Sequence, residues 1–393
     1  MNDVVIVSAC RTPLGSFRGS LSSLTATQLG AIAVKEAVSR AGLKPEDVDE
    51  VIMGNVVGAG LGQAPARQAA IFAGLPPSVK TLTVNKVCGS GLKAVMLAAQ
   101  AIRLGDARVV VAGGMESMSN IPYLLEKARD GYRMGHGELV DAMIKDGLYD
   151  VYNKYLMGMA GELCAKECDV PREAQDHFAI ESYKRAQAAQ RDGKFKAEIV
   201  GVEVKGAKGE SQIVVDDEDV TRTNFDKIPQ LKPAFQKDGT ITAANASKIS
   251  DGAAALVLTT ADHARVLGLK PLARIISQAS SAKKPEWFTT APADVIPKIL
   301  QKASMTVEDI DLFEVNEAFA VVALITNRLA GLDPAKVNVN GGAIALGHPI
   351  GASGARILVT LLHALQHRGL KRGMAAICIG GGEASAVIVE RLN

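Results

Sequence analysis

Aromatic side chains are scarce in this 393-residue sequence: they make up 4% of it, with Trp287 as the single tryptophan. An excess of one charge is missing too, because 44 Lys and Arg balance 42 Asp and Glu to a net charge of +2. Such balance argues against the basic face of a nucleic-acid-binding protein. The hydrophobic share of 48% excludes a disordered chain. We therefore expect a folded protein with a small-residue core and no nucleic-acid partner.

Long apolar runs are also missing. No stretch of about 18 apolar residues runs without a charge, so we expect no membrane span. Residues 1–7 are too short an apolar run for a signal peptide and carry Asp3 where a basic region belongs. We interpret them as a strand of a cytoplasmic protein. In that reducing compartment the five cysteines are expected to be thiols. Only Cys164 and Cys168 are closely spaced, which is too few ligands for a structural zinc site.

Glycine, by contrast, is abundant: 38 of the 393 residues are glycine, which is about 10% against a usual share of about 7%. Several glycines belong to an internal repeat. Residues 41–49 resemble residues 303–311, and residues 90–94 resemble residues 353–357, at offsets of 262 and 263 residues. A nearly constant offset across several elements predicts two copies of one α/β unit.

Within each copy short apolar runs alternate with helical patterns, which is typical of βαβ units. We predict strands at 3–9, 50–56, 81–86, 108–113, 272–280, 311–315, 336–339, 374–379 and 384–391. We predict helices at 25–41, 64–74, 90–104, 291–304, 317–329 and 353–367. Residues 119–248 match neither copy, which predicts an inserted domain with helices near 138–145, 158–168 and 171–191. The predicted division is therefore 1–118 with 249–270, then 119–248, then 271–393.

Cys88 stands in a glycine-rich turn, residues 85–91, between a predicted strand and helix. The start of a helix favours a thiolate, so this position predicts a lowered thiol pKa and a nucleophile. A buried cysteine in a tight turn is the alternative.

His348 lies in the equivalent glycine-rich turn of the second copy, 260 residues after Cys88. If the copies are related by a pseudo-two-fold axis, both turns meet at one cleft, where a histidine would activate the cysteine. A capping or packing histidine is the alternative.

Two further residues end strands at the same edge. Cys378 precedes Gly380, Gly381 and Gly382, whose backbone N–H groups could stabilise an oxyanion. A core cysteine is the alternative there. Asn316 follows the strand 311–315 and is either a helix N-cap or a group that holds a water or a carbonyl oxygen.

Four blocks of sequence, at 87–91, 316–319, 347–349 and 378–382, together resemble the thiolase family. The resemblance extends over essentially the whole chain and includes residues 11–13, 113–117 and 245–253. It implies an α/β fold, the duplicated five-layered α-β-α-β-α arrangement with an inserted loop domain. It also implies thioester-dependent Claisen chemistry on acyl-CoA.

The resemblance implies a role for each block. Cys88 would take the acyl group as a thioester, and His348 would be its activating base. Cys378 would exchange a proton with the α-carbon of the second acyl-CoA. Asn316, through a water, and His348 would stabilise the enolate oxygen, while the N–H groups of Cys88 and Gly380 would form the other oxyanion hole. No metal or redox cofactor is expected, because CoA is a substrate.

The resemblance also places CoA on the inserted domain. Arg222 would approach the adenosine 3′-phosphate, with a solvated surface charge as the alternative. Ser247 would contact the pantetheine arm and Phe235 would line its tunnel. Further substrate contacts are expected from Leu156, Met157, Ala318 and Phe319.

Two departures from the family pattern bear on acyl-chain length. Leu156 stands where many acetoacetyl-CoA thiolases have histidine, and residues 284–292 carry Trp287 and Phe288 in an unusual segment. Residues 141–148, however, resemble acetyl-specific, tetrameric members. The first expectation is therefore a tetrameric (dimer-of-dimers) acetyl-CoA C-acetyltransferase that interconverts acetyl-CoA and acetoacetyl-CoA. The alternatives are a 3-ketoacyl-CoA thiolase of broader chain length in fatty-acid β-oxidation and a non-catalytic acyl-CoA-binding member.

Overall fold

The structure is a computed structural model that describes residues 3–205 and 209–392. Its strands are β1 Val4–Arg11, β2 Gly15–Ser16, β3 Glu50–Gly54, β4 Lys80–Val84, β5 Val109–Ser117, β6 Tyr123–Leu124, β7 Val140–Asp141, β8 Tyr149–Asp150, β9 Tyr155–Leu156, β10 Val202–Lys205, β11 Ser211–Val214, β12 Ser250–Thr260, β13 Ala273–Ala282, β14 Leu312–Val315, β15 Arg372–Ile379 and β16 Glu383–Arg391. Its α-helices are α1 Ala26–Arg40, α2 Pro65–Phe72, α3 Ser90–Leu104, α4 Met157–Glu167, α5 Arg172–Arg191, α6 Ala261–Val266, α7 Ala291–Ala303, α8 Ala320–Ala330, α9 Ala343–Leu346 and α10 Ser353–Arg368.

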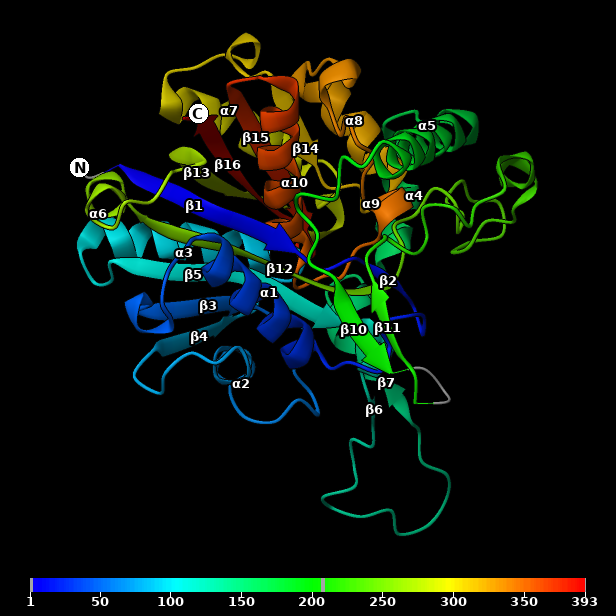
Figure 1. Ribbon diagram of the computed structural model, residues 1–393. Helices are drawn as coiled ribbons and strands as arrows, with labels where there is room; N and C mark the ends of the chain where they lie inside the picture. The colour runs from blue at the N-terminus through cyan, green and yellow to red at the C-terminus, as the bar shows by residue number, and fades with distance from the viewer. Residues whose placement is uncertain (1–2, 206–208, 393) are drawn as a thin grey trace.

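The main sheet consists of two halves with the same strand pattern. The first half has the order β1-β12-β5-β3-β4 and the second has β13-β16-β15-β14, and two residue pairs between β1 and β13 join them. In each half the first three strands are antiparallel, and the next pair, β5 with β3 or β15 with β14, is parallel. Figure 1 shows the blue-to-cyan half below the yellow-to-red half.

Helices cover both faces of both halves and give five layers. Helices α1 and α2 pack on the outer face of the first half, and α7 packs on the outer face of the second. Helices α3 and α10 lie between the two halves in one shared core. A Cβ atom on Gly91 or Gly354 would collide with the opposite helix, so these two glycines let the helices approach closely. This confirms the predicted five-layered fold and explains why its core is built from small residues.

The structure differs from the sequence prediction at β12 and at residues 336–339. The unpredicted strand β12 pairs with both β1 and β5 and is fully buried over most of its length. A strand that is covered on both faces has a continuous apolar sequence, so β12 lacks the alternation of polar and apolar residues that marks a half-exposed strand. The strand predicted at 336–339 is reduced to a single bridge between Val337 and Phe313. Asn338 adopts a left-handed backbone, φ +47°, which interrupts an extended chain.

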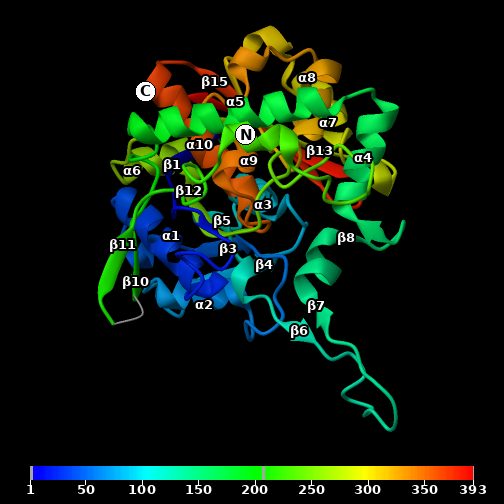
Figure 2. The ribbon, with the colours of Figure 1, turned by 90° about the vertical axis from the view of Figure 1, so that its right-hand side faces the viewer.

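The helix predicted near 138–145 is also wrong. Val140 and Asp141 form β7, which pairs with β6, and a short helical turn follows at Ile144–Leu148. The Asp141 carboxylate accepts the Met143 N–H at 2.8 Å, which starts the turn after the strand rather than before it. Between β6 and β7 a long loop projects from the body of the molecule (Figure 2).

Within the described residues one helical segment, Val87–Leu104, is long and apolar enough to cross a membrane. It contains α3, the middle-layer helix, and 56% of it is buried inside the protein. It also carries Lys93 and Arg103. Its burial between the two halves of the sheet identifies it as a core helix.

Candidate active site

The turn that carries Cys88 is held by its own backbone and by Ser90. The Ser90 hydroxyl accepts the Lys86 N–H at 2.8 Å and donates to the Val87 carbonyl at 2.6 Å. Val87 has a left-handed backbone, φ +45°, which is costly for a β-branched residue. A Cβ on Gly89 would collide with Ile379 of β15. The strained turn therefore presses Cys88 against the end of the strand that carries Cys378.

The Cys88 thiol is in an enclosed environment. Burial raises its pKa to about 11, although the N–H groups of Gly380 and of Cys88 itself hydrogen-bond the sulfur and act in the opposite direction. The predicted lowering of this pKa is therefore wrong, because the loss of hydration outweighs the helix terminus. The two N–H groups converge on the sulfur.

Cys378 lies beside Cys88 near the end of β15. It is 1% exposed, and the N–H groups of Cys378 and Ala318 hydrogen-bond its sulfur. Burial raises its pKa well above the usual value, and an ionised Cys88 raises it further. Cys378 is therefore a thiol, and thus an acid, at neutral pH.

His348 is buried and neutral. Its Nδ1 lies 2.6 Å from Ser353 Oγ, and its backbone N–H donates to the Lys248 carbonyl at 3.0 Å. Nε2 has no hydrogen-bond partner within residues 3–205 and 209–392. Burial lowers the His348 pKa to about 3, and the nearby Arg356 charge contributes in the same direction. The imidazole is therefore uncharged at neutral pH, and an imidazolium would be stable there only beside a negative charge such as a Cys88 thiolate.

Asn316 follows β14, and its backbone N–H donates to the Ala376 carbonyl at 3.0 Å. Helix α8 begins at Ala320, four residues later, so the N-cap alternative is wrong. The Asn316 side chain is buried, yet neither amide atom finds a hydrogen-bond partner in the part of the chain that the structure describes. A buried amide normally has partners, so this one is available to a water or a substrate.

An apolar cavity of about 280 Å³ adjoins these residues. His348 and the predicted substrate contacts Leu156, Met157, Phe235, Ser247 and Phe319 all line it. Sequence reasoning missed the other lining residues, which are Met118, Met143, Ile144, Leu148, Gly158, Ala246, Lys248, Ile249 and Ile350. Cys88 packs against a cluster that includes Met118, Met143 and Ile350, so the cavity leads towards the thiol.

Two predicted substrate contacts lie outside this lining. Ala318 is buried, in the cluster that also holds Cys378 and Phe319. Arg222 is half exposed and pairs with Glu218 at 2.5 Å and with Ser16 Oγ at 3.1 Å. In this structure Arg222 is therefore a surface residue engaged with the acidic run 216–219.

Comparison with known proteins agrees with this geometry. The thiolase N-terminal domain family matches residues 4–262, and the thiolase C-terminal domain family matches residues 269–391. The chain belongs to the thiolase family. An acetyl-CoA acetyltransferase of Cupriavidus necator is 56% identical over 392 residues, which cover 100% of both chains.

Solved thiolase structures are similarly close. The acetyl-CoA acetyltransferase of Bacillus anthracis superposes with a TM-score of 0.97 at 41% identity, covering 100% of this chain and 99% of the other. The Acat5 thiolase of Ascaris suum, in complex with coenzyme A, gives 0.94 at 46% identity, covering 99% and 100%.

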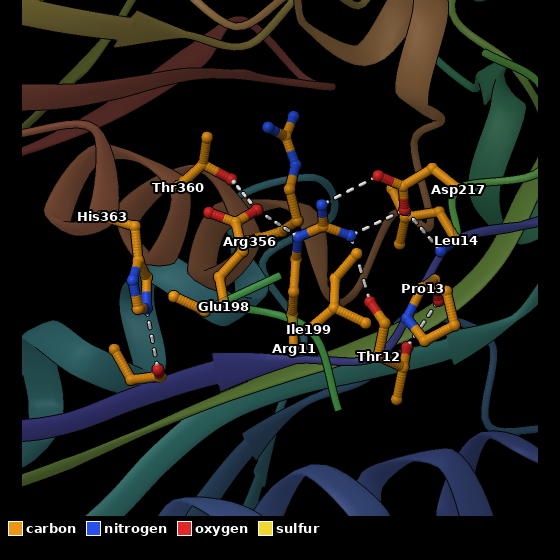
Figure 3. A network of polar contacts seen from close by, with 12 residues as sticks. Arg11, Thr12, Pro13, Leu14, Glu198, Ile199, Asp217, Arg356, Thr360 and His363 are labelled. Atoms are coloured by element: carbon orange, nitrogen blue, oxygen red, sulfur yellow. Dashed lines mark hydrogen bonds and ion pairs between the residues drawn. The ribbon is translucent and has the colours of Figure 1, made fainter. Parts of the chain in front are cut away.

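A buried polar network joins β1, α10 and the segment between the two copies of this thiolase (Figure 3). Arg11 of β1 pairs with Glu198 at 2.6 Å and with Asp217 at 2.7 Å, both from the segment between the copies. Thr360 of α10 donates to the same Glu198 at 3.1 Å. Among the described residues no group of three His, Cys, Asp or Glu could hold a metal ion. The sequence analysis did not predict this network, although residues 11–13 belong to the stretches that carry the family resemblance.

Proposed function

We propose that this thiolase catalyses the reversible condensation of two acetyl-CoA molecules to acetoacetyl-CoA and CoA, through an acetyl thioester on Cys88. The observation that carries the proposal is the convergence of the Cys88 and Gly380 N–H groups on the Cys88 sulfur, with the Cys378 thiol beside it. The similarity to the acetyl-CoA acetyltransferases named above supports acetyl as the acyl group that is transferred.

In the thiolysis direction the first step uses His348 as the base. Its Nε2 takes the Cys88 proton, and the thiolate attacks the 3-keto carbon of acetoacetyl-CoA. The C2–C3 bond then breaks and leaves acetyl-Cys88 and the enolate of acetyl-CoA. His348, now protonated, and Asn316, through a water, stabilise the enolate oxygen. Such preorganised donors are effective in a site that excludes water.

The α-carbon of the enolate takes its proton from Cys378, which releases acetyl-CoA. The raised pKa of Cys378 supports this role, because it keeps the proton on the sulfur until a carbanion needs it.

In the second half-reaction CoA gives its thiol proton to the Cys378 thiolate and attacks acetyl-Cys88. The N–H groups of Cys88 and Gly380 hold the carbonyl oxygen as charge develops on it. Cys88 then leaves and takes its proton back from His348, which restores the enzyme. Condensation is the reverse, and the CoA thioester supplies the activation, so the proposed chemistry uses no metal or redox cofactor.

For CoA we propose that the pantetheine arm runs through the apolar cavity past Ser247 and Met157, with Ala318 and Phe319 near the acyl end. The cavity's apolar lining suits an alkyl arm. Arg222 would leave its pair with Glu218 to meet the 3′-phosphate. Lys248, at the same cavity, is a second cation available to CoA.

We also propose a cytoplasmic homotetramer that acts in fatty-acid metabolism. The projecting loop between β6 and β7 exposes Met134 almost completely, and Leu139 to 71%, which suits a contact with another copy. Light scattering on the purified chain, with and without that loop, tests the assembly. Fractionation of the source cells tests the compartment.

The experiment that tests the proposed chemistry separates its two half-reactions. Cys378→Ala should still take an acetyl group from acetyl-CoA, because CoA can leave as a thiolate without help from an acid. It should lose condensation and thiolysis by about 100-fold or more, because the proton exchange at the α-carbon needs Cys378. Cys168→Ala is the matched control and should keep both. Normal turnover by Cys378→Ala would overturn the assignment.

A further inference from the structure

We propose that Asn338 is a positioning residue that fixes Asn316 for its part in enolate stabilisation. The inference rests on the proposed function, because it takes Asn316 to hold the enolate oxygen. Asn338 belongs to none of the four sequence blocks that carry the family resemblance. It lies in the segment where a strand was predicted and was not found.

The Asn338 side chain clamps both neighbours of Asn316. Its Oδ1 accepts the Val315 N–H at 2.8 Å, and its Nδ2 donates to the Val315 carbonyl at 2.8 Å. Nδ2 also donates to Glu317 Oε1 at 2.9 Å. One amide thus replaces the next strand of the sheet and grips the residues before and after Asn316.

The clamp is itself held in place. The Asn338 N–H donates to the Phe313 carbonyl and the Gly341 N–H donates to the Asn338 carbonyl, both at 2.9 Å. Glu317 is anchored from the other side, where its Oε2 accepts Ser182 Oγ at 2.7 Å and the Ile344 N–H at 3.2 Å. Asn338 therefore connects β14 to anchors on α5 and α9.

The backbone of Asn338 shows that this placement is costly. Its φ of +47° lies in the left-handed region, and the residue is 2% exposed. Glycine would adopt this backbone more easily, and asparagine is tolerated there better than most residues. A strained residue held by its surroundings next to an active site points to a functional constraint.

Asn316 needs such a clamp because its own amide has no side-chain partner among the described residues. Its direction is set by the backbone at Val315, Asn316 and Glu317, and Asn338 bonds to the two flanking residues. A displacement of about 1 Å at a reacting group is enough to slow a reaction by about 100-fold. Loss of the clamp should therefore act on the enolate steps.

The test substitutes Asn338→Gly, which keeps the left-handed backbone but removes the clamp. Ser304→Gly is the matched control, since Ser304 is an exposed residue with φ +54° at the end of α7. Asn316→Ala and the double variant complete a mutant cycle. Each protein is assayed for thiolysis of acetoacetyl-CoA and for acetylation of Cys88 by acetyl-CoA, by intact mass. Asn338→Asp is a second probe, because it keeps the acceptor for Val315 N–H and loses both donors.

We expect Asn338→Gly and Asn338→Asp to lower kcat for thiolysis by roughly 10-fold to 100-fold with little change in KM. Cys88 acetylation should stay near normal, and Ser304→Gly should be fully active. The double variant should be no slower than Asn316→Ala, because Asn338 acts through Asn316.

Other results would overturn the positioning role. These are normal kcat in Asn338→Gly, a kcat loss that adds to that of Asn316→Ala, or a loss of acetylation and thiolysis together, which would mean a merely structural role. If Asn316→Ala itself retains full kcat, the enolate role in the proposed function fails, and the clamp has no catalytic target. That outcome is distinguishable, because it does not depend on any Asn338 variant.

Discussion

His348 Nδ1 lies 2.6 Å from Ser353 Oγ, and Ser353 Oγ in turn donates to the Pro349 carbonyl at 2.9 Å. A hydroxyl has one proton to give, so Nδ1 must be the donor in the first bond. The proton therefore sits on Nδ1 and leaves Nε2 as the free lone pair. The loop that carries His348 thus sets its tautomer through a residue in the first turn of α10.

Ser353→Ala should remove this control and let the proton move to Nε2. We expect kcat to fall by about 10-fold or more, as happens when a catalytic histidine loses its orienting partner. The ¹⁵N shifts of His348 should change from the Nδ1-protonated pattern to a mixture. Ser22→Ala, which removes a similar hydroxyl-to-carbonyl bond at Gly19, should change neither. Unchanged ¹⁵N shifts in Ser353→Ala would contradict the tautomer assignment.

The reactivity of Cys88 should depend on pH as expected of a thiol whose pKa is raised by its surroundings. Because its pKa is raised to about 11, the thiolate fraction in the folded protein is small at neutral pH and grows through pH 10. The rate of Cys88 alkylation by iodoacetamide should therefore rise about tenfold per pH unit from 7 to 9 without a plateau. In the unfolded chain the same cysteine should level off near its usual pKa of about 8.5. A plateau below pH 8 in the folded protein would mean a preformed thiolate.

The buried pair of Arg356 and Glu314, 3.7 Å apart, should contribute to stability. Burial raises the pKa of Glu314 to about 8, so the pair is mostly ionised only above that pH. Removing one partner then leaves an uncompensated buried charge, so Arg356→Met should lower the free energy of unfolding by about 3 kcal/mol in urea at pH 9. Arg356→Met with Glu314→Gln should recover most of that loss, because no charge is then left unpaired. Arg265→Met, which breaks an exposed pair with Asp262, should cost less than about 1 kcal/mol. Equal losses in the single and double variants would contradict this account.

Three phenylalanines should limit the acyl chain. The rings of Phe235 and Phe319 lie 6.0 Å apart, and those of Phe288 and Phe319 lie 6.5 Å apart, in the cluster that contains Cys378. Phe288→Ala should open space there and improve kcat/KM for a six-carbon ketoacyl-CoA relative to the four-carbon substrate by about 10-fold or more. Phe195→Ala, at a buried ring elsewhere, should leave that ratio unchanged. An unchanged ratio in Phe288→Ala would mean that the ring does not limit chain length.

The duplication and the candidate site were predictable because local signals repeat at a fixed offset. The turns at Cys88 and His348 are marked by glycines whose close contacts the structure shows. Strand β12 was not predictable in the same way, because its sequence has no alternating pattern and its place in the sheet depends on distant partner strands. Its pairing with β1 and β5 brings together residues that are about 140 to 250 positions apart in sequence.

The pKa of Cys88 is a second property that the sequence did not predict. The helix terminus that favours a thiolate is visible in the sequence, whereas the burial that opposes it depends on packing between the two halves. The same holds for Asn338, whose clamp on Val315 joins residues 23 positions apart on either side of α8. Residue types, spacing and the family resemblance predicted which groups react, and the fold determines the environment of those groups.

The measurement that most directly tests the proposed mechanism is mass spectrometry of the protein after brief incubation with acetyl-CoA alone, followed by digestion. One acetyl group should appear on the peptide that contains Cys88, and it should disappear when CoA is added. An acetyl group on another residue, or none on the native protein, would contradict the role of Cys88 as the nucleophile.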